Sequence, residues 1–323
     1  MAMIELKDVS KEYVVVKKEK GLKGSFKNLV HKETSIKKAV DHISFEIQPG
    51  EIVGYIGPNG AGKSTTVKMM SGILTPSSGE ILINGISPQK DRKGVVKNLG
   101  VVFGQRTQLQ WDLRLGESFE LLKRIYQIPD KLYKDNLKQM NDIFEIESFI
   151  DTPVRQLSLG QRMRGDLAAA VLHSPSVLFL DEPTIGLDVD AKYSVRKFIK
   201  EINEKRNTTV ILTTHDLGDI EELCKRLMII NRGKIIEDGS LSELVDRIAP
   251  YRNLVVEYYS EVHPEHPKAN ITSISGNQVV YQFQKNEITA AKLLEELSAK
   301  EPVLDIRLED AKIDDIIRVA YGQ

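Results

Sequence analysis

The sequence predicts an α/β protein with a buried, mostly parallel sheet, followed by a smaller α+β unit. Three apolar runs of strand length, EIVGYIG (51–57), SVLFLDEPT (176–184) and TTVILTTH (208–215), each lead into a helical sequence. Continuous apolar strands that alternate with helices are typical of parallel sheets covered on both faces. Ligands of open α/β sheets bind at the carboxyl ends of the strands, so we look for a site there.

Other segments complete this first domain, which we expect to cover residues 1–244. MIELKDVSKEY (3–13) and AVDHISFEIQPGE (39–51) alternate between apolar and polar residues and indicate antiparallel strands at one side. Residues from about 115 to 175 have a helical period and predict a helical subdomain. The Lys-rich stretch 17–38 has apolar residues at helical spacing. It indicates either a solvated surface insertion or a basic amphipathic piece that touches a membrane surface or a partner.

A second pattern begins near residue 245 and predicts an α+β accessory domain over 245–323. NLVVEYY predicts a strand, and NITSISGNQVVYQFQ predicts a hairpin that turns at Gly276-Asn277. EITAAKLLEELSAK has the period of an amphipathic helix. VLDIRLE predicts a further strand, and AKIDDIIRVAYG predicts a closing helix with Gly322 near its end.

Composition limits the class of protein. The chain has 323 residues, 41% of them hydrophobic and 28% charged, with a formal net charge of −1, which gives no support for bulk nucleic-acid binding. Its one cysteine, Cys224, allows no internal disulfide and fits a reducing compartment. The segment MAMIELKDVSKEY lacks the apolar region of a signal peptide. No run reaches the roughly 20 apolar residues that a transmembrane helix needs, so we expect any action at a membrane to require a partner.

The clearest motif is GPNGAGKS (57–64), which fits the phosphate-binding pattern G-x-x-x-x-G-K-S. It follows a predicted strand and opens a predicted helix, as that motif requires. Small residues let backbone N–H groups turn toward phosphate oxygens, while Lys63 can reach the β- and γ-phosphates and Ser64 can bind Mg²⁺. The predicted nucleotide-binding residues here are Gly57, Asn59, Gly60, Ala61, Gly62, Lys63, Ser64 and Thr65.

Two carboxylates and a histidine follow two other predicted strands. Asp181 fits the carboxylate that organises Mg²⁺, and Glu182 follows it, where it could polarise an attacking water. An acidic pair can also cap a helix, although its pairing with the phosphate-binding loop favours the catalytic interpretation. His215 ends the strand TTVILTT; a lone histidine is more often structural, but the end of a parallel strand is where ligands bind.

Three further features have weaker support from the residues alone. Gln105 follows an apolar strand, and its amide can bind Mg²⁺ or hold a water. Tyr13 could stack on adenine, although its spacing fits a core tyrosine equally well. QLSLGQRMR (156–164) places Ser158 and Gly160 before a strong helical sequence, where a helix N-terminus can meet an anion. One chain therefore carries two phosphate-facing loops that lie far apart in the sequence.

The order of these motifs resembles the nucleotide-binding subunit of ATP-binding-cassette (ABC) transporters. The resemblance covers about residues 3–240 and rests on Tyr13, GPNGAGKS, Gln105, LSLGQ, LFLDEP, GLD (186–188) and His215, in that order. VVFGQRTQLQWDL and LSLGQRMR are similar to the ATPase subunits of ABC-2-type exporters, in the group of sodium-extrusion and drug-efflux ATPases. The resemblance implies a P-loop NTPase fold: an ABC ATPase core with an antiparallel β subdomain and a helical subdomain.

The resemblance also implies the ligands and the roles. They are ATP and Mg²⁺, with Glu182, His215, Gln105 and Lys63 as catalytic residues and Ser64, Gln105 and Asp181 at the metal. In this family two copies pack head to tail, and each signature loop closes over the γ-phosphate that the other copy holds. The residues implied for that contact are Ser158, Gly160 and Gln161. The chain departs from the family at Leu159, where Gly is usual, and through the insertion at 17–38, which lengthens the path from Tyr13 to the P-loop.

The function implied is an ATPase subunit that drives export through a separate integral-membrane permease, at the cytoplasmic side of the cell membrane. Trp111 and Leu113 are candidate permease contacts, or they pack internally. The alternative is a soluble ABC ATPase of translation or DNA repair, but those carry two cassettes or a long coiled coil, and this sequence has one P-loop and no sustained heptads. Glu182 and His215 argue against a regulator that binds nucleotide without hydrolysis. We expect no nucleic-acid partner.

Overall fold

The computed structural model describes residues 1–16, 34–104, 106–310 and 313–321. The chain divides into two compact units, Met1–Asp238 and Gly239–Gln323, and each is described by itself. The division falls at Gly239, close to the predicted position of 245. No described helix has both the length and the apolar character needed to cross a bilayer.

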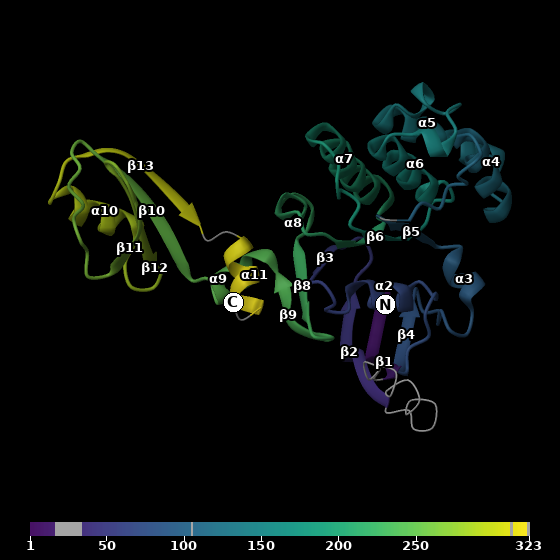
Figure 1. The fold of residues 1–323 in the computed structure, drawn as a ribbon, viewed down its shortest axis with the longest axis horizontal. Coiled ribbons are helices and arrows are strands. Elements are labelled where there is room, and N and C mark those ends of the chain that lie inside the picture. Colours follow the sequence, from purple (N-terminus) through teal and green to yellow (C-terminus); the bar gives the residue numbers. More distant parts are fainter. Residues whose placement is uncertain (17–33, 105, 311–312, 322–323) are drawn as a thin grey trace, which may run out of the picture. The chain divides into compact units, whose positions relative to one another are not determined.

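A six-stranded sheet is the centre of the first unit, in the order β5-β6-β7-β3-β8-β9 (Figure 1). Its strands are β3 (Ile52–Ile56), β5 (Leu99–Phe103), β6 (Val177–Asp181), β7 (Thr209–Thr213), β8 (Arg226–Asn231) and β9 (Lys234–Ser240). The pairs from β5 to β8 in that order are parallel, which confirms the predicted parallel sheet. Every residue of β7 is buried, as expected for a strand covered on both faces. The carboxyl ends of β6, β7 and β3 therefore lie at one edge.

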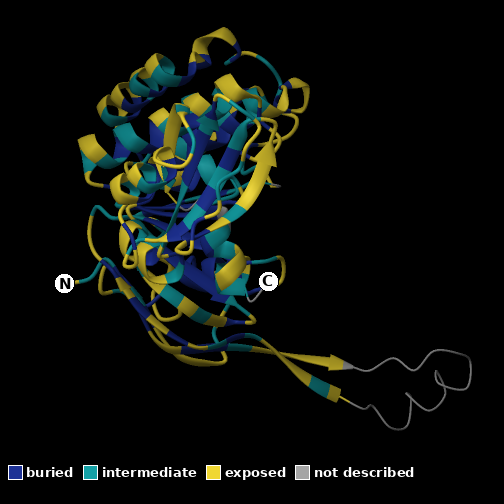
Figure 2. Cartoon of the chain, turned by 90° about the vertical axis from the view of Figure 1, so that its left-hand side faces the viewer, coloured by how far each residue is buried: buried dark blue, intermediate teal, exposed yellow. Residues whose placement is uncertain are grey.

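An antiparallel sheet, in the order β2-β1-β4, forms a second layer. Its strands are β1 (Ile4–Val16), β2 (Thr34–Ile47) and β4 (Ser78–Ile83). Figure 2 shows that the last residues of β1 and the first residues of β2 are mostly exposed. Residues 34–38 pair with β1 inside β2, so the insertion predicted at 17–38 is too long at its C-terminal end, because the strand continues there. The rest of that predicted insertion, 17–33, lies outside the described residues.

Helices connect and cover the strands. They are α2 (Lys63–Met70), α3 (Arg92–Val96), α4 (Leu115–Tyr126), α5 (Asp130–Phe144), the 3₁₀ turns η1 (Ile146–Ser148) and η2 (Val154–Gln156), α6 (Leu159–Val171), α7 (Val189–Arg206) and α8 (Leu217–Leu223). The run from α4 to α6 is the predicted helical subdomain, inserted between β5 and β6 (Figure 1). A capping box starts α6, and the Asp188 side chain caps α7, so both helices begin where the sequence supplies an N-cap.

The second unit is a four-stranded antiparallel sheet, in the order β11-β12-β10-β13, with three helices. Its elements are α9 (Leu241–Ile248), β10 (Tyr251–Tyr258), β11 (Ala269–Ser275), β12 (Gln278–Gln284), α10 (Ala290–Ser298), β13 (Val303–Asp310) and α11 (Ile313–Tyr321). β11 and β12 pair around Gly276, whose φ is 61°, so the predicted hairpin is confirmed. The core of this unit contains side chains of β10, β12 and α10.

A half-buried histidine fixes the junction between the helical subdomain and β5. His173, just after α6, stacks on Tyr126 with ring centroids 4.1 Å apart and planes 11° apart. Its Nε2 atom lies 3.2 Å from the Leu99 carbonyl oxygen. Burial lowers the pKa of His173 to about 4, because the charged ring would lose its hydration.

This pKa gives a pH dependence of stability. Unfolded His173 takes up a proton near pH 6.5, whereas folded His173 resists until about pH 4, so its stabilising contribution is complete above pH 6.5 and is lost as pH falls toward 4. His173→Phe keeps a ring beside Tyr126 without a titrating group. We expect the wild type to lose about 2 kcal/mol more unfolding free energy than the variant between pH 7 and pH 5.

Urea unfolding followed by the fluorescence of Trp111, the single tryptophan, measures this difference in the first unit. Burial raises the pKa of the Asp166 carboxyl to about 6, but Asp166 titrates in both proteins and cancels in the comparison. Parallel pH profiles for the two proteins would contradict the assignment.

Candidate nucleotide site

The loop between β3 and α2 has the backbone that the P-loop motif predicts. Gly62 is the N-cap of α2 with φ 118°, and a β-carbon there would lie 2.5 Å from the Ala39 carbonyl oxygen, so only glycine fits. The Lys63 ammonium donates to the Gly57 carbonyl, 2.5 Å away, which folds this side chain back over the loop. Burial lowers the pKa of Lys63, and the nearby Glu182 and Asp181 carboxylates oppose that shift.

Asp181, at the end of β6, joins two other elements through its carboxylate. It accepts hydrogen bonds from Ser64 Oγ at 3.1 Å and from Thr213 Oγ1 at 2.5 Å. Ser64, Asp181 and Glu182 line a cavity of about 360 Å³. Hydroxyl and carboxylate oxygens are the ligands that Mg²⁺ prefers, so this pair fits a magnesium ion held jointly with phosphate oxygens. No cluster of three or more His, Cys, Asp or Glu side chains suited to a metal occurs in the described parts of the chain.

Glu182 and His215 meet at the same edge of the sheet. His215 Nε2 lies 3.0 Å from Glu182 Oε1. Glu182 has a φ of 56°, in the left-handed region that side chains rarely adopt, and its N–H donates to the Thr213 carbonyl at 2.9 Å. Bonding to β7 thus holds a strained backbone that aims the carboxylate at the histidine. The structure brings together the ends of three strands that the sequence suggested separately.

The segment around Gln105 approaches this edge closely, although Gln105 itself lies outside the described residues. The Gly104 N–H donates to the Asp181 carbonyl at 2.7 Å, and a β-carbon at Gly104 would lie 2.5 Å from the Glu182 carbonyl oxygen. After Gln105 the buried Asp166 of α6 fixes the chain, since it accepts from Thr107 Oγ1 at 2.8 Å and from the Gln108 N–H at 3.0 Å.

A buried polar network behind the site was missed in the sequence. Asp219 of α8 is fully buried and accepts from Thr184 Oγ1 at 2.5 Å, Thr214 Oγ1 at 2.8 Å and Arg196 Nε at 2.7 Å. Thr184 lies two residues after Glu182, and Thr214 directly precedes the predicted histidine. Asp219 therefore ties the segments that carry both candidate catalytic groups. No sequence motif marks this network, because its members come from four separate elements.

The signature loop forms a second, separate cavity. Ser158 caps α6: its Oγ accepts from the Gln161 N–H at 3.2 Å, and Gln161 Oε1 accepts from the Ser158 N–H at 3.0 Å. Leu159, which replaces the usual Gly, starts the helix without a positive φ, and its side chain is 40% exposed. A β-carbon at Gly160 would contact the Ala191 side chain at 3.7 Å, an ordinary van der Waals distance. Packing against the described residues of this chain therefore does not require glycine there.

The cavity beside this loop has a volume of about 580 Å³ and is lined by Ser158, Gly160 and Asp188, among others. It shares no lining residue with the cavity of about 360 Å³ that Ser64, Asp181 and Glu182 line. Within one copy of the chain the two phosphate-facing loops therefore belong to different sites.

Three aromatic and aliphatic side chains named from the sequence lie at the surface or close to it. Tyr13 is 39% exposed and has the Lys11 ammonium 5.5 Å from its ring centroid, so the core-tyrosine alternative is wrong. Trp111 is 50% exposed, with the Arg162 guanidinium 5.9 Å from its ring, so internal packing is also wrong for Trp111. Leu113 is partly buried.

Comparison with known proteins places this geometry in a family. The family model described as ABC transporter matches residues 40–185. The Nod factor export ATP-binding protein I of Burkholderia pseudomallei (strain 1710b) is 34% identical over 269 residues, 82% of this chain and 87% of that protein. The probable multidrug ABC transporter ATP-binding protein YbhF of Escherichia coli (strain K12) is 35% identical over 208 residues, 64% of this chain, and the match spans only 35% of YbhF.

A solved structure agrees with the fold. It is the dimeric post-hydrolysis state of the ATP-binding cassette MJ0796 bound to ADP and Pi, with a TM-score of 0.62 and 27% identity over 74% of this chain and 99% of that one. The fold is thus that of an ABC ATPase cassette, with an antiparallel β layer and a helical subdomain around the parallel sheet. Together with the Nod factor export relative, this likeness shows that the chain belongs to the family of ABC transporter ATP-binding proteins.

Proposed function

We propose that this chain binds ATP with Mg²⁺, hydrolyses it, and uses the cycle to drive export through a separate membrane permease. The observation that supports this most directly is the meeting of three strand ends at one edge of the sheet. There Ser64 Oγ lies 3.1 Å from Asp181, and Glu182 lies 3.0 Å from His215. A phosphate-binding loop, a metal-binding pair and a candidate base at one edge are the parts that nucleotide hydrolysis needs.

Each side chain has a role that its position supports. Lys63 leaves the Gly57 carbonyl and turns to the β- and γ-phosphates, while the loop N–H groups hold the same oxygens. Ser64 and Asp181 would hold Mg²⁺, which when bound neutralises the charge that develops on the phosphates. Glu182 orients the attacking water and accepts its proton, and the contact of its carboxylate with His215 Nε2 at 3.0 Å keeps that carboxylate in place. Gln105 would contact the metal or the water, and Tyr13 would stack on adenine.

The second loop supports a head-to-tail homodimer. Ser158, Gly160 and Gln161 lie at the start of α6, where free N–H groups and the helix dipole favour an anion. Their cavity is separate from the P-loop cavity, so a second copy is the natural source of the phosphate they meet. Gly160 is then small because another chain comes close to it. Loss of the γ-phosphate removes the shared contact, and the dimer can open.

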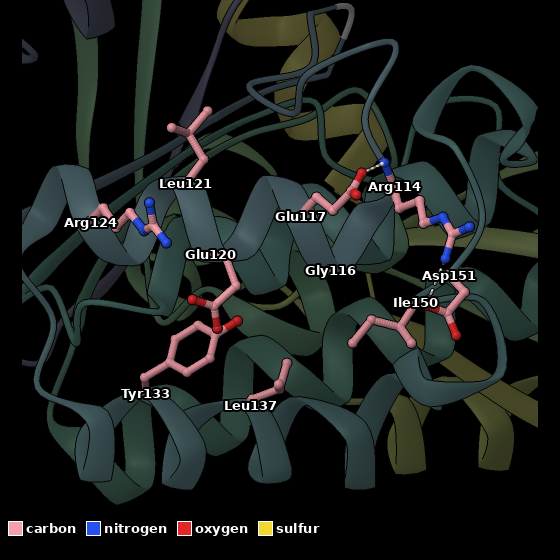
Figure 3. A pocket seen from close by; sticks show the side chains of 10 residues that line it. All are labelled: Arg114, Gly116, Glu117, Glu120, Leu121, Arg124, Tyr133, Leu137, Ile150 and Asp151. Carbon is pink, nitrogen blue, oxygen red and sulfur yellow. Dashed lines mark hydrogen bonds and ion pairs between the residues drawn. The ribbon is translucent and has the colours of Figure 1, made fainter.

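The helical subdomain is the proposed contact with the permease, at the cytoplasmic side of the cell membrane. A groove of about 590 Å³ lies between α4 and α5 (Figure 3); the exposed Leu121 and Ile125 lie on α4, and the exposed Trp111 shortly precedes it. Exposed apolar side chains grouped in one region mark interaction surfaces. Export is supported by the Nod factor export relative and by the exporter-like motifs, and the same relatives do not favour a soluble role in translation or DNA repair. The direction of transport is tested with inverted membrane vesicles, into which an exporter would take up its substrate in an ATP-dependent way.

Lys63→Ala tests nucleotide binding. Removing the ammonium should weaken ATP binding by at least about a hundredfold, because charge-assisted bonds to two phosphates are lost. Isothermal titration with Mg-ATP measures this, with Lys93→Ala, an exposed lysine on α3, as the matched control. An affinity that stays within a factor of two would exclude Lys63 from the phosphate site.

Glu182→Gln tests hydrolysis. The amide keeps the size of the side chain but accepts no proton, so turnover should fall by about 10²–10⁴-fold while ATP still binds and holds a dimer. ATPase rate and sedimentation with Mg-ATP are the two measurements. Glu204→Gln, an exposed carboxylate on α7, serves as control. Parental turnover in Glu182→Gln would remove Glu182 from the reaction.

Asp219→Asn tests the network behind the site. The variant removes the buried carboxylate that Thr184, Thr214 and Arg196 share, so we expect a loss of about 3 kcal/mol in unfolding free energy and a lower turnover at saturating ATP. Glu222→Gln, on the same helix and also paired with Arg196 at 3.3 Å, is partly exposed and should cost under about 1 kcal/mol. Equal losses of unfolding free energy and of turnover in the two variants would contradict this structural role of Asp219.

A further inference from the structure

The second unit has an open sheet edge that the proposed ATP cycle does not use. β13 is the last strand in the order β11-β12-β10-β13, and among the described strands it pairs with β10 alone. The free side of an edge strand carries backbone groups that can bind another strand. One side of β13 is therefore available to pair with a further strand.

The register identifies which residues of β13 face the open side. The Tyr258 N–H of β10 donates to the Asn277 carbonyl at 2.9 Å, so even-numbered residues of β10 bond toward β12 and odd-numbered residues bond toward β13. Val255 of β10 lies opposite Arg307 of β13, so the odd residues of β13 bond to β10. The backbone of Ile306 and Leu308 is left on the open side, whereas Leu304 lies at a bulge, because the register shifts between the Glu257–Asp305 and Tyr258–Val303 pairs.

Ile306 and Leu308 form an apolar stripe that their own unit leaves half uncovered, and Leu304 lies beside it at the bulge. Ile306 lies opposite Val256, and Leu308 opposite Leu254, so the stripe continues the core face of the sheet. Val256 and Leu254 are almost fully buried, whereas Leu304, Ile306 and Leu308 are 48%, 45% and 45% exposed. α10 packs on the inner strands, and the outer part of the face ends in solvent. Edge strands with exposed aliphatic side chains are prone to pair.

The sequence of this edge is complementary to itself. When two copies of β13 run antiparallel with Ile306 opposite Ile306, Asp305 meets Arg307 in both directions, and Leu308 of each copy faces the bulge at Leu304 of the other. The Ile306 pair exchanges its two backbone bonds, and the Asp305–Arg307 pairs fall at the adjacent positions, where side chains come closest. We propose that a second copy of this chain docks here, so that two four-stranded sheets become one continuous sheet.

The charges around β13 favour this occupant. Glu257 of β10 lies opposite Asp305, so two carboxylates share one face and attract a cation. Arg307 of the second copy supplies it. Within the described residues of the single chain, Asp305 accepts from the Ile306 N–H at 2.7 Å alone, and Arg307 pairs with Glu309 along its own strand at 3.1 Å. Such exposed local contacts stabilise little, so exchanging them for contacts across the two-fold axis costs little.

The first test uses the full chain without nucleotide, so that an ATP-bridged dimer cannot form. Sedimentation over about 1–100 µM should show a reversible dimer whose dissociation constant falls within that range. Ile306→Asp should leave the chain monomeric, and Ile274→Asp, an exposed isoleucine on the opposite edge strand β11, should not. A wild type that stays monomeric, or a dimer that survives Ile306→Asp, would overturn the proposal.

A charge exchange tests the register even where Ile306→Asp disturbs folding. Asp305→Arg places two arginines opposite each other, and Arg307→Asp places two aspartates there, so each single variant should weaken the dimer by about tenfold or more. The double variant Asp305→Arg/Arg307→Asp restores both pairs. An equimolar mixture of the two single variants also restores them, as a heterodimer. A double variant and a mixture that both stay as weak as the single variants would rule out the antiparallel self-pairing.

Discussion

The ladder between β6, β7 and β3 is the constraint on which the nucleotide site depends. Parallel pairing sets the ends of these strands side by side, and Thr213 of β7 then bonds both to the Asp181 carboxylate and, through its backbone, to the Glu182 N–H. Without that register Glu182 would have no reason to keep its left-handed φ, and its contact with His215 would be lost. The chemistry proposed for the site follows from backbone pairing first and from side chains second.

The buried network around Asp219 extends this constraint into the helices. It links α7, α8 and the two segments that follow β6 and β7, so a shift of either helix would move the candidate catalytic groups. The Asp166 carboxylate does the same for the segment that follows Gln105, from within α6. α6 also begins at the signature loop. A change at that loop is therefore mechanically connected, through one helix, to the segment that approaches Asp181.

Local patterns in the sequence predicted most of the fold and the residues of the site, because those signals are short. The P-loop, the apolar strands and the Gly276-Asn277 turn each occupy about ten residues or fewer, and the structure agrees with them. The network of Asp219 and Arg196 could not be predicted from the sequence, because its members lie in separate elements that meet only after the sheet has formed. The end of the predicted 17–38 insertion was wrong because Thr34–Lys38 is mostly polar and exposed, without the alternation of a half-buried strand, yet pairs with β1.

The two units place different demands on an interface between copies. A nucleotide-bridged contact has to open after hydrolysis, so it must be weak once the γ-phosphate has gone, and copies held only in that way would separate at each turn of the cycle. The β13 contact involves no nucleotide group, so its strength is independent of the bound ligand. A pair joined through β13 would keep the two cassettes at a high effective concentration, and closure would become an event within one assembly. The proposed β13 contact would therefore supply what the ATP site cannot supply for itself, a link between its two halves that does not depend on the bound nucleotide.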